Sequence, residues 1–243
     1  MKIHFYHIQK IGGRSIICSF IAGAMNKKIE TPKDVENIWD LYIQSNSKVL
    51  YLDKMTIFGH GGLNWVGDSS LVASHTPYKA IKFPTIDIFT ITSIRNPIDR
   101  ILSIYKESIL EISGDYDKTL RCCHNGLQRL PEYKSKDIIE FCHKIPEQTV
   151  FGQTYFLNND DKNPDNAIDI LKKINHVLIL ENLKNDLNDL SQKINMDLPC
   201  VHVGMTTTDN SKYINESQYK ELEKMLESEI YFYNKVKEYK GLI

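Results

Sequence analysis

The sequence lacks the features that would indicate a disulfide-rich, metal-binding or membrane-spanning protein. Five of its 243 residues are cysteines. The number is odd and no C-x-x-C pair occurs, so neither a disulfide framework nor a zinc site is expected. No run of about 18 apolar residues exists, and the sequence predicts no membrane span. The first residues also lack the pattern of a signal peptide. Together these absences predict a reduced, cytoplasmic protein.

The chain also has no excess of charge of one sign, with 30 basic and 31 acidic residues. A large nucleic-acid footprint or a polybasic membrane surface needs such an excess, so neither partner is expected. No H-E-x-x-H segment or acidic pair indicates a metal, and we expect none. Hydrophobic residues make up 42% of the chain, which is enough for a substantial core. We expect a single domain over residues 1–243.

Strand and helix patterns alternate along the chain. Lys2–Ile8 is apolar on both faces, as in a buried strand, and Arg14–Met25 has the apolar spacing of a helix. Ile86–Ile94 is a second strong strand, and Asn96 and Pro97 begin the helix after it. The alternation predicts an α/β fold with a central parallel sheet flanked by helices on both faces. Further strands are expected at Ser70–Ser74 and His176–Leu180, strands or loops at Val49–Leu52 and Thr56–Phe58, helices at Asp34–Gln44, Ala167–Ile174, Leu183–Ile194 and Ser217–Tyr239, broken helices over 117–157, and a polar loop at Asn158–Asn166.

The stretch His7–Ser15, HIQKIGGRS, joins the first strand to the first helix. Gly12 and Gly13 permit a tight turn with its N–H groups aimed inward. The helix start adds partial positive charge, and Lys10 adds a full charge. A nucleotide-triphosphate loop would read G-x-x-x-x-G-K-[ST], whereas here the lysine precedes the glycines. The stretch predicts an anion site of another kind, and an ordinary glycine turn with a surface lysine is the alternative.

A second candidate anion site lies in Thr92–Tyr105, TSIRNPIDRILSIY. Arg95 comes at the end of a strand and therefore at the carboxyl edge of the sheet, where α/β proteins bind ligands. Ser103 lies two helical turns into the next helix and is expected to face back toward Arg95. A guanidinium fork with a hydroxyl suits a phosphate monoester. The alternative is a helix cap with a structural salt bridge from Arg95 or Arg100 to an acid.

Taken together, the two stretches resemble the signatures of the PAPS-dependent sulfotransferases. They are most similar to the carbohydrate branch of the heparan sulfate 6-O and 2-O type and its bacterial relatives. That branch typically reads H-I-x-K-T-G-G-T-S in the first signature and approximately L-R-[DN]-P-[VI]-x-R-x-L-S-x-[YW] in the second. The chain also resembles three less specific motifs of the family, at Gln153–Leu157, Val177–Glu181 and Glu229–Tyr233. The resemblance implies a P-loop-NTPase-like, three-layer α/β fold.

The resemblance also implies a donor and the residues that bind it. The family takes a sulfuryl group from 3′-phosphoadenosine-5′-phosphosulfate (PAPS) and releases adenosine 3′,5′-bisphosphate (PAP). The implied 5′-phosphosulfate site consists of Lys10, Ile11, Gly12, Gly13, Arg14 and Ser15, and the implied 3′-phosphate site of Arg95 and Ser103. Ile11 and Arg14 stand where the family has threonines. One hydroxyl contact is lost, while Arg14 adds a cation that either strengthens the 5′ site or points toward an anionic acceptor.

Lys10 and one histidine are the expected catalytic residues. Lys10 is placed to neutralise charge on the bridging oxygen as the sulfur–oxygen bond breaks, and histidine is the usual base at neutral pH. His75, in SHTPY, resembles the G-H-x-P segment of many bacterial members. His60, in FGHGGLNW, resembles the G-L-H-x-x-W segment that supplies the base in the 6-O branch, with Trp65 beside the acceptor. We slightly favour His75, and both histidines remain candidates.

Three functions remain open on the sequence. The leading expectation is transfer of a sulfuryl group to a hydroxyl or an amine of a small molecule, a bacterial natural product or a carbohydrate. A small-molecule kinase of related fold is disfavoured because the sequence lacks both the G-K-[ST] motif and a clear acidic ligand for magnesium. A non-catalytic nucleotide-binding relative is kept open by Ile11 and Arg14. The sequence specifies neither the acceptor nor the oligomeric state.

Overall fold

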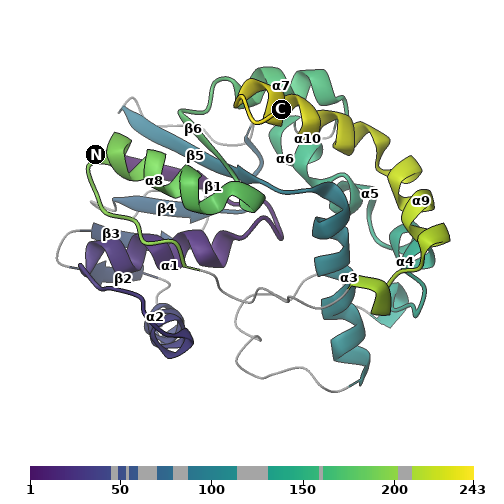
Figure 1. Cartoon of the computed structure of the whole chain (residues 1–243), viewed down its shortest axis with the longest axis horizontal. Helices are drawn as coiled ribbons and strands as arrows, with labels where there is room; N and C mark the ends of the chain where they lie inside the picture. Colours follow the sequence, from purple (N-terminus) through teal and green to yellow (C-terminus); the bar gives the residue numbers. More distant parts are fainter. Residues whose placement is uncertain are drawn as a thin grey trace.

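A computed structural model describes residues 1–44, 49–52, 55–59, 70–78, 87–113, 131–158, 161–201 and 210–243. Its centre is a sheet with the strand order β2-β3-β4-β1-β5-β6 (Figure 1). The strands are β1 (Lys2–Tyr6), β2 (Val49–Leu52), β3 (Met55–Gly59), β4 (Leu71–Ser74), β5 (Ile88–Ile94) and β6 (His176–Ile179). Every neighbouring pair is parallel except β2–β3, which is antiparallel. The predicted α/β fold with a central parallel sheet is confirmed, and β2 adds an antiparallel edge.

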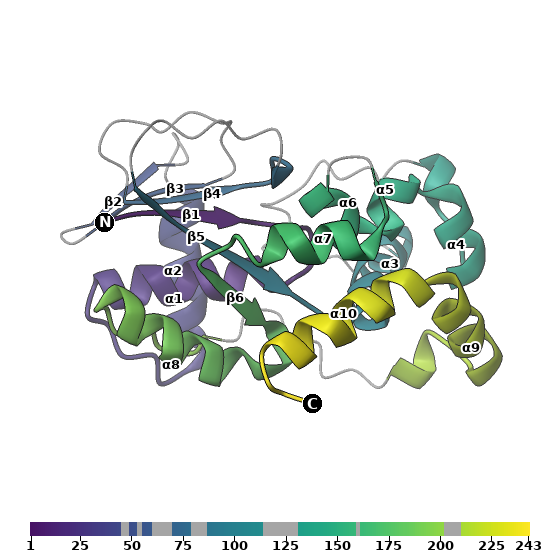
Figure 2. The same cartoon turned by 90° about the horizontal axis from the view of Figure 1, so that it is seen from above.

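Helices surround this sheet and extend beyond its carboxyl edge. The described helices are α1 (Gly13–Ala24), α2 (Pro32–Gln44), α3 (Pro97–Ser113), α4 (Ile138–Lys144), α5 (Glu147–Val150), α6 (Gly152–Asn158), α7 (Pro164–Leu171), α8 (Leu183–Ile194), α9 (Glu216–Met225) and α10 (Glu227–Tyr239), with 3₁₀ turns at Pro131–Tyr133, Leu180–Asn182 and Asn210–Lys212. Figure 2 shows α1 and α8 on one face of the sheet and α7 on the other. Helices α3 to α6 and α9 gather beyond the carboxyl ends of the strands (Figure 1). None of the described helices is long and apolar enough to cross a membrane.

β1 is the central strand and determines where a ligand can bind. It pairs with β4 on one side and β5 on the other, and the side chains of both its faces are buried. From β1 the chain continues through α1 toward the β3 side, whereas from β5 it continues toward β6. The direction of the connections therefore reverses between β1 and β5. Open α/β sheets bind ligands at such a point, outside the carboxyl ends of the strands.

Two predicted elements differ from the structure by more than two residues. The single helix expected at Ser217–Tyr239 is two helices, because Leu226, at φ −97° and ψ 16°, interrupts the helical backbone. Its side chain is fully buried and belongs to a second core cluster between α3, α4 and α9. Helix α7 begins inside the expected loop Asn158–Asn166, because the side chain of Asn163 caps it by accepting bonds from the two N–H groups of residues 165 and 166.

A buried histidine on β1 makes folding sensitive to acid. His4 is 2% exposed, and burial lowers its pKa from 6.5 to about 4. Between these two values the unfolded chain binds a proton that the folded chain does not, so protonation favours unfolding. We expect the free energy of unfolding to fall as the pH drops from 6.5 toward 4, with about 3 kcal/mol contributed by His4.

Urea titrations at a series of pH values measure this dependence. The variant His4→Gln should show a shallower loss of stability over the same interval, whatever its stability at pH 7. Burial also lowers the pKa of His75 and His176, so part of the slope should remain. An unchanged slope in the variant would rule out His4 as the main acid-sensitive group.

Candidate functional site

The loop between β1 and α1 contains two residues with left-handed backbone. Lys10 has φ 65° and Gly12 has φ 85°. The left-handed backbone favours glycine at position 12, and a Cβ there would also lie 2.3 Å from Leu180 Cδ1, so that the Leu180 side chain would have to move. Gly12 also precedes α1, and no side-chain hydrogen bond caps that helix. The first N–H groups of α1 and the partial positive charge of its N-terminus therefore suit an anion.

Three consecutive carbonyl oxygens of this loop accept hydrogen bonds from residues 93–100, which span the end of β5 and the start of α3. The bonds are Arg100 Nε to Gln9 O at 3.1 Å, Arg95 Nη1 to Lys10 O at 3.2 Å and Ser93 Oγ to Ile11 O at 2.9 Å. The C=O and N–H groups of a trans peptide point in opposite directions. The N–H groups of residues 10 to 12 are therefore directed away from this segment. The two stretches that the sequence singled out thus meet at one edge of the sheet.

Arg95 is held by a buried glutamine. Its backbone N–H donates to Gln153 Oε1 at 2.8 Å, and Gln153 Nε2 donates back to the Arg95 carbonyl at 3.0 Å. Gln153 Nε2 also donates to Glu229 Oε2 at 3.0 Å. The buried Glu229 carboxylate accepts a second bond from the Thr154 N–H at 2.8 Å, at the start of α6. This network fixes the backbone of Arg95 while its guanidinium reaches the loop.

The residue after Arg95 is held in a similar way. The Asn96 N–H donates to Glu181 Oε1 at 2.8 Å, and the Tyr233 hydroxyl donates to Glu181 Oε2 at 3.0 Å. The Asn96 side chain caps α3, as predicted, by accepting bonds from the N–H groups of residues 98 and 99. Of the three less specific motifs of the sequence, Gln153–Leu157 and Val177–Glu181 therefore bond directly to the Arg95–Asn96 corner. The third motif, Glu229–Tyr233, is connected to the corner through Gln153 and Glu181.

Arg100 is structural, but its partners are backbone carbonyls rather than the acid that the alternative interpretation required. It is 1% exposed. Besides Gln9 O it donates to Val150 O at 3.1 Å and to Thr149 O at 2.8 Å. Burial lowers its pKa, and the charge of Glu229 opposes that shift. Arg100 therefore joins the loop after β1 to the carboxyl end of α5.

The ammonium group of Lys10 forms an ion pair with Glu107, a residue that the sequence did not single out. Both side chains are mostly buried. Glu107 follows Ser103 by four positions on α3, so the two side chains lie on one helical face. The expected facing of Ser103 toward Arg95 is not seen as a hydrogen bond among the described residues. The i, i+4 spacing from Ser103 is the only sequence signal that would have indicated Glu107.

The two departures from the family pattern have different surroundings. Ile11 is fully buried in the main core, so an apolar contact stands where the family has a hydroxyl. The Arg14 guanidinium lies 5.2 Å from the centre of the Trp39 ring on α2, a cation–π contact. Ser15 is buried, and its carbonyl accepts a bond from Ser19 Oγ at 2.9 Å. Whether these residues contact a donor stays a prediction.

Of the two candidate bases, only His75 lies within the described residues; His60 and Trp65 lie outside them. His75 directly follows β4, as expected. Its ring is 4.2 Å from the His7 ring, centre to centre, and His7 in turn packs so closely on Gly13 that a Cβ there would lie 1.8 Å from Nε2. Burial lowers the pKa of His75, and a hydrogen bond with the His7 backbone partly opposes this shift. The imidazole is therefore neutral, the form of a base, at pH 7.

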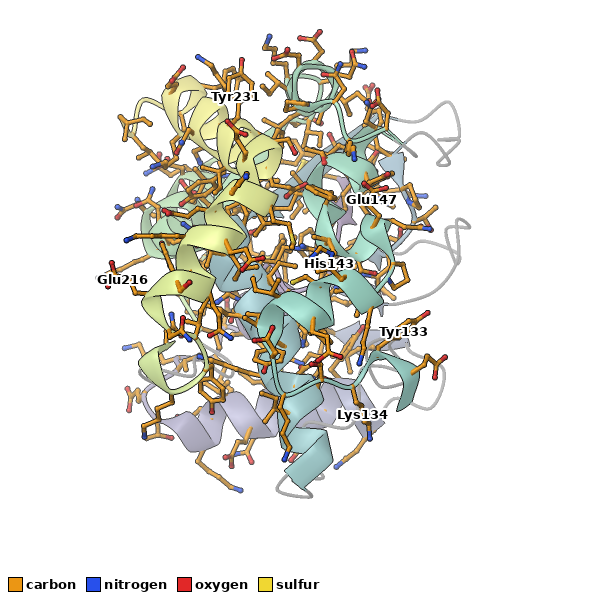
Figure 3. All side chains as sticks on the ribbon, turned by 90° about the vertical axis from the view of Figure 1, so that its right-hand side faces the viewer. Tyr133, Lys134, His143, Glu147, Glu216 and Tyr231 are labelled. Carbon is orange, nitrogen blue, oxygen red and sulfur yellow. The ribbon has the colours of Figure 1, made fainter. Side chains whose placement is uncertain are left out.

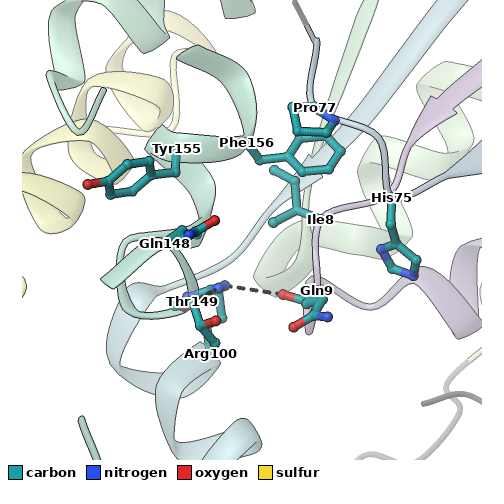
Figure 4. Close-up of a pocket in the computed structure, with 10 residues that line it drawn as sticks. Ile8, Gln9, His75, Pro77, Arg100, Gln148, Thr149, Tyr155 and Phe156 are labelled. Carbon is teal, nitrogen blue, oxygen red and sulfur yellow. Dashed lines mark hydrogen bonds between the residues drawn. The ribbon is translucent and has the colours of Figure 1, made fainter. Parts of the chain in front are cut away.

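A cavity of about 230 Å³ lies next to His75 (Figure 4). Its described lining is Ile8, Gln9, His75, Pro77, Arg100, Gln148, Thr149, Gly152, Tyr155 and Phe156. These residues follow β1 and β4 or belong to α3, α5 and α6, so the cavity lies on the β4 side of the loop and Arg95 on the β5 side. By contrast, His143 is exposed on α4, on the helical side of the molecule (Figure 3). The described residues contain no cluster of three or more potential metal ligands.

The contact between α6 and Arg100 can be tested with Gly152→Ala. A Cβ at this position would lie 1.9 Å from Arg100 Nη2, and the three carbonyl bonds leave that guanidinium little freedom to move. Displacing it costs charged hydrogen bonds of about 1.5–3 kcal/mol each. We expect the free energy of unfolding, measured in urea, to fall by roughly 3 kcal/mol.

Gly241→Ala is the matched control. Gly241 has φ 68°, and a Cβ added to it would have no neighbouring atom within 4 Å. The substitution therefore costs only the strain of a left-handed backbone, about 1 kcal/mol. Equal losses of unfolding free energy in the two variants would show that the guanidinium is free to move and that Arg100 does not stabilise the site.

Comparison with known proteins assigns no family to the chain. No family model matches it, and no curated protein matches its sequence. The function is therefore inferred from the sequence motifs together with the site: the uncapped N-terminus of α1, Lys10 with its carboxylate partner, the fixed Arg95, and the cavity beside His75.

Proposed function

We propose that this protein is a sulfotransferase that uses PAPS as its donor and acts on a small molecule or a sugar in the cytoplasm. The observation that carries the proposal is the hydrogen bond from Arg95 Nη1 to Lys10 O, which joins the two stretches that the sequence predicts to bind anions, 85 positions apart. Such a pair suits a donor with two separate anionic groups. The sequence resemblance supplies the identity of that donor.

The residues present fit such a donor. The α1 N-terminus, the left-handed turn at Gly12 and the Lys10 ammonium are complementary to a 5′-phosphosulfate. Arg95 gives one N–H to the loop and retains others for a 3′-phosphate, which a planar guanidinium binds well. Glu107 competes for Lys10, so the donor anion must replace a carboxylate. Bound PAPS supplies an activated sulfuryl group on a phosphate leaving group.

The roles of the protein side chains follow from their positions and charges. Lys10 neutralises the negative charge that develops on the leaving oxygen. His75 accepts the proton of the attacking hydroxyl, because burial lowers its pKa and keeps its imidazole neutral, and the His7 backbone orients the ring. The cavity beside His75 holds the acceptor. His60 remains the alternative base.

A nucleotide-binding protein without catalytic activity is the second candidate. Lys10 is paired with Glu107, and the guanidinium of Arg14 lies over Trp39. Both cations of the loop therefore have partners within the protein, as they would in a chain that has lost the reaction but kept the fold. Sulfate transfer from PAPS to a panel of metabolites separates this candidate from the enzyme.

Nucleotide binding tests the donor assignment. We expect PAP to raise the melting temperature by mass action, and ATP with magnesium to leave it unchanged. The variant Arg95→Ala should weaken the binding of PAP by about 1.5–3 kcal/mol, which calorimetry would measure as a roughly 10- to 150-fold increase in Kd. Adenosine 5′-phosphate is the matched control, since it lacks the 3′-phosphate and should bind both proteins alike. A similar loss for both nucleotides would remove Arg95 from the 3′-phosphate site.

The pH dependence of turnover tests the base. We expect His75→Ala to lower kcat at least about a hundredfold with little change in PAP affinity. Since burial lowers the pKa of His75, the wild-type rate should hold at pH 6.5 and decline only below it, and the variant should lack this acidic limb. The control His143→Ala changes an exposed histidine and should keep both rate and profile. Normal turnover in His75→Ala would assign the base to His60.

A further inference from the structure

The cavity beside His75 has the size of a single ring. Its volume is about 230 Å³, and a cavity of about 150 Å³ already admits benzene. A six-membered ring with several substituents therefore fits, whereas a longer oligosaccharide would place only one residue inside. The carboxyl ends of β1 and β4 form one wall, and α5 and α6 form the opposite wall (Figure 4).

One part of the cavity wall is apolar. The ring of Phe156 faces Ile8 and Pro77, and the three side chains lie together (Figure 4). Tyr155 points away from them, and its hydroxyl donates to Glu147 Oε2 at 3.1 Å. An aromatic ring beside aliphatic groups packs well against the C–H face of a ring-shaped ligand.

Two amide side chains supply the polar part. Gln9 lies near His75, and Gln148 lies across the cavity from them (Figure 4). Neither amide takes part in a side-chain hydrogen bond among the described residues. An amide both donates and accepts and carries no charge, so the two together suit hydroxyl groups on different edges of one ligand.

Among the described lining residues, the charged side chain of Arg100 is buried and only 1% exposed. Arg100 is the one ionised group among the described lining residues, and three of its five N–H groups donate to the carbonyls of Gln9, Thr149 and Val150. The nearby carboxylate of Glu229 offsets part of its charge. An ionic ligand would lose its hydration, and a guanidinium that is buried and already bonded to three carbonyls would compensate that costly loss only weakly.

We propose that this cavity binds the acceptor as a neutral, polyhydroxylated six-membered ring, a cyclitol or a single sugar residue. Phe156, Ile8 and Pro77 contact one face of the ring, and Gln9 and Gln148 bind its hydroxyl groups, with one hydroxyl beside His75. The role as acceptor rests on the proposed sulfotransferase function. Binding of the ring itself requires no donor.

Saturation-transfer NMR and calorimetry on the full chain test the proposal. The probes are myo-inositol and methyl β-glucoside as neutral rings, glucuronate as an anion and glucosamine as a cation. We expect the neutral rings to bind, and the charged rings to bind at least roughly tenfold more weakly because their charges are desolvated. The proposal is overturned if either charged ring binds more tightly than the neutral rings, or if neither neutral ring binds.

The variant Gln148→Leu removes one amide while nearly keeping the side-chain volume. Gln148 is exposed enough that the fold should be unaffected, and we expect a roughly five- to tenfold loss of ring affinity, typical of one neutral hydrogen bond. The control Gln192→Leu makes the same change at an exposed site on α8 and should have no effect. Unchanged ring affinity in Gln148→Leu also overturns the proposal.

Nucleotide binding separates the two proposals. If the neutral rings bind and depend on Gln148 while PAP does not bind, the cavity assignment stands and the donor assignment is wrong. If PAP binds and depends on Arg95 while the neutral rings do not bind, the sulfotransferase proposal stands and the cavity assignment is wrong.

Discussion

A buried guanidinium connects the parts of the candidate site. Arg100 donates to the loop after β1 and to the last carbonyls of α5, so two segments from distant parts of the sequence share one side chain. A buried charge is costly unless it is hydrogen-bonded, and here carbonyl groups and the nearby Glu229 offset that cost. The buried carboxylate of Glu229 binds the start of α6. The positions of loop, cavity wall and Arg95 corner are thus interdependent.

The features that the sequence predicted correctly depend on local patterns. Apolar runs bounded by glycine, asparagine and proline indicate β1, β5 and the helices after them, because periodicity and capping act within a few residues. The meeting of Lys10 and Arg95 follows from one further rule, that parallel strands end at a common edge. The break at Leu226 carries no glycine or proline and depends on packing in the second core, so local patterns missed it.

The features that were missed depend on contacts between distant residues. Glu107 lies 97 positions from Lys10, and many other acids in the chain were equally available as partners. The binding of Arg100 to carbonyls could not be predicted, since every residue has a backbone carbonyl and the sequence does not show which of them will accept a side-chain bond. The same holds for the amides of Gln9 and Gln148, which line one cavity only because α5 lies near the loop after β1. His60 and the Arg14 contact with a donor stay predictions.

Under the proposed function, the carboxylate partner of Lys10 affects which anions the loop binds. Because the charge of Glu107 cancels that of the lysine at short range, the pair attracts distant anions only weakly. An incoming anion exchanges one ion pair for another, and its gain is the difference between the two attractions. A singly charged ion offers Lys10 about what the carboxylate already provides. Under the proposed function, a phosphosulfate offers more charge in the same volume together with acceptors for the α1 N–H groups, so Glu107 would exclude anions of lower charge density from the loop.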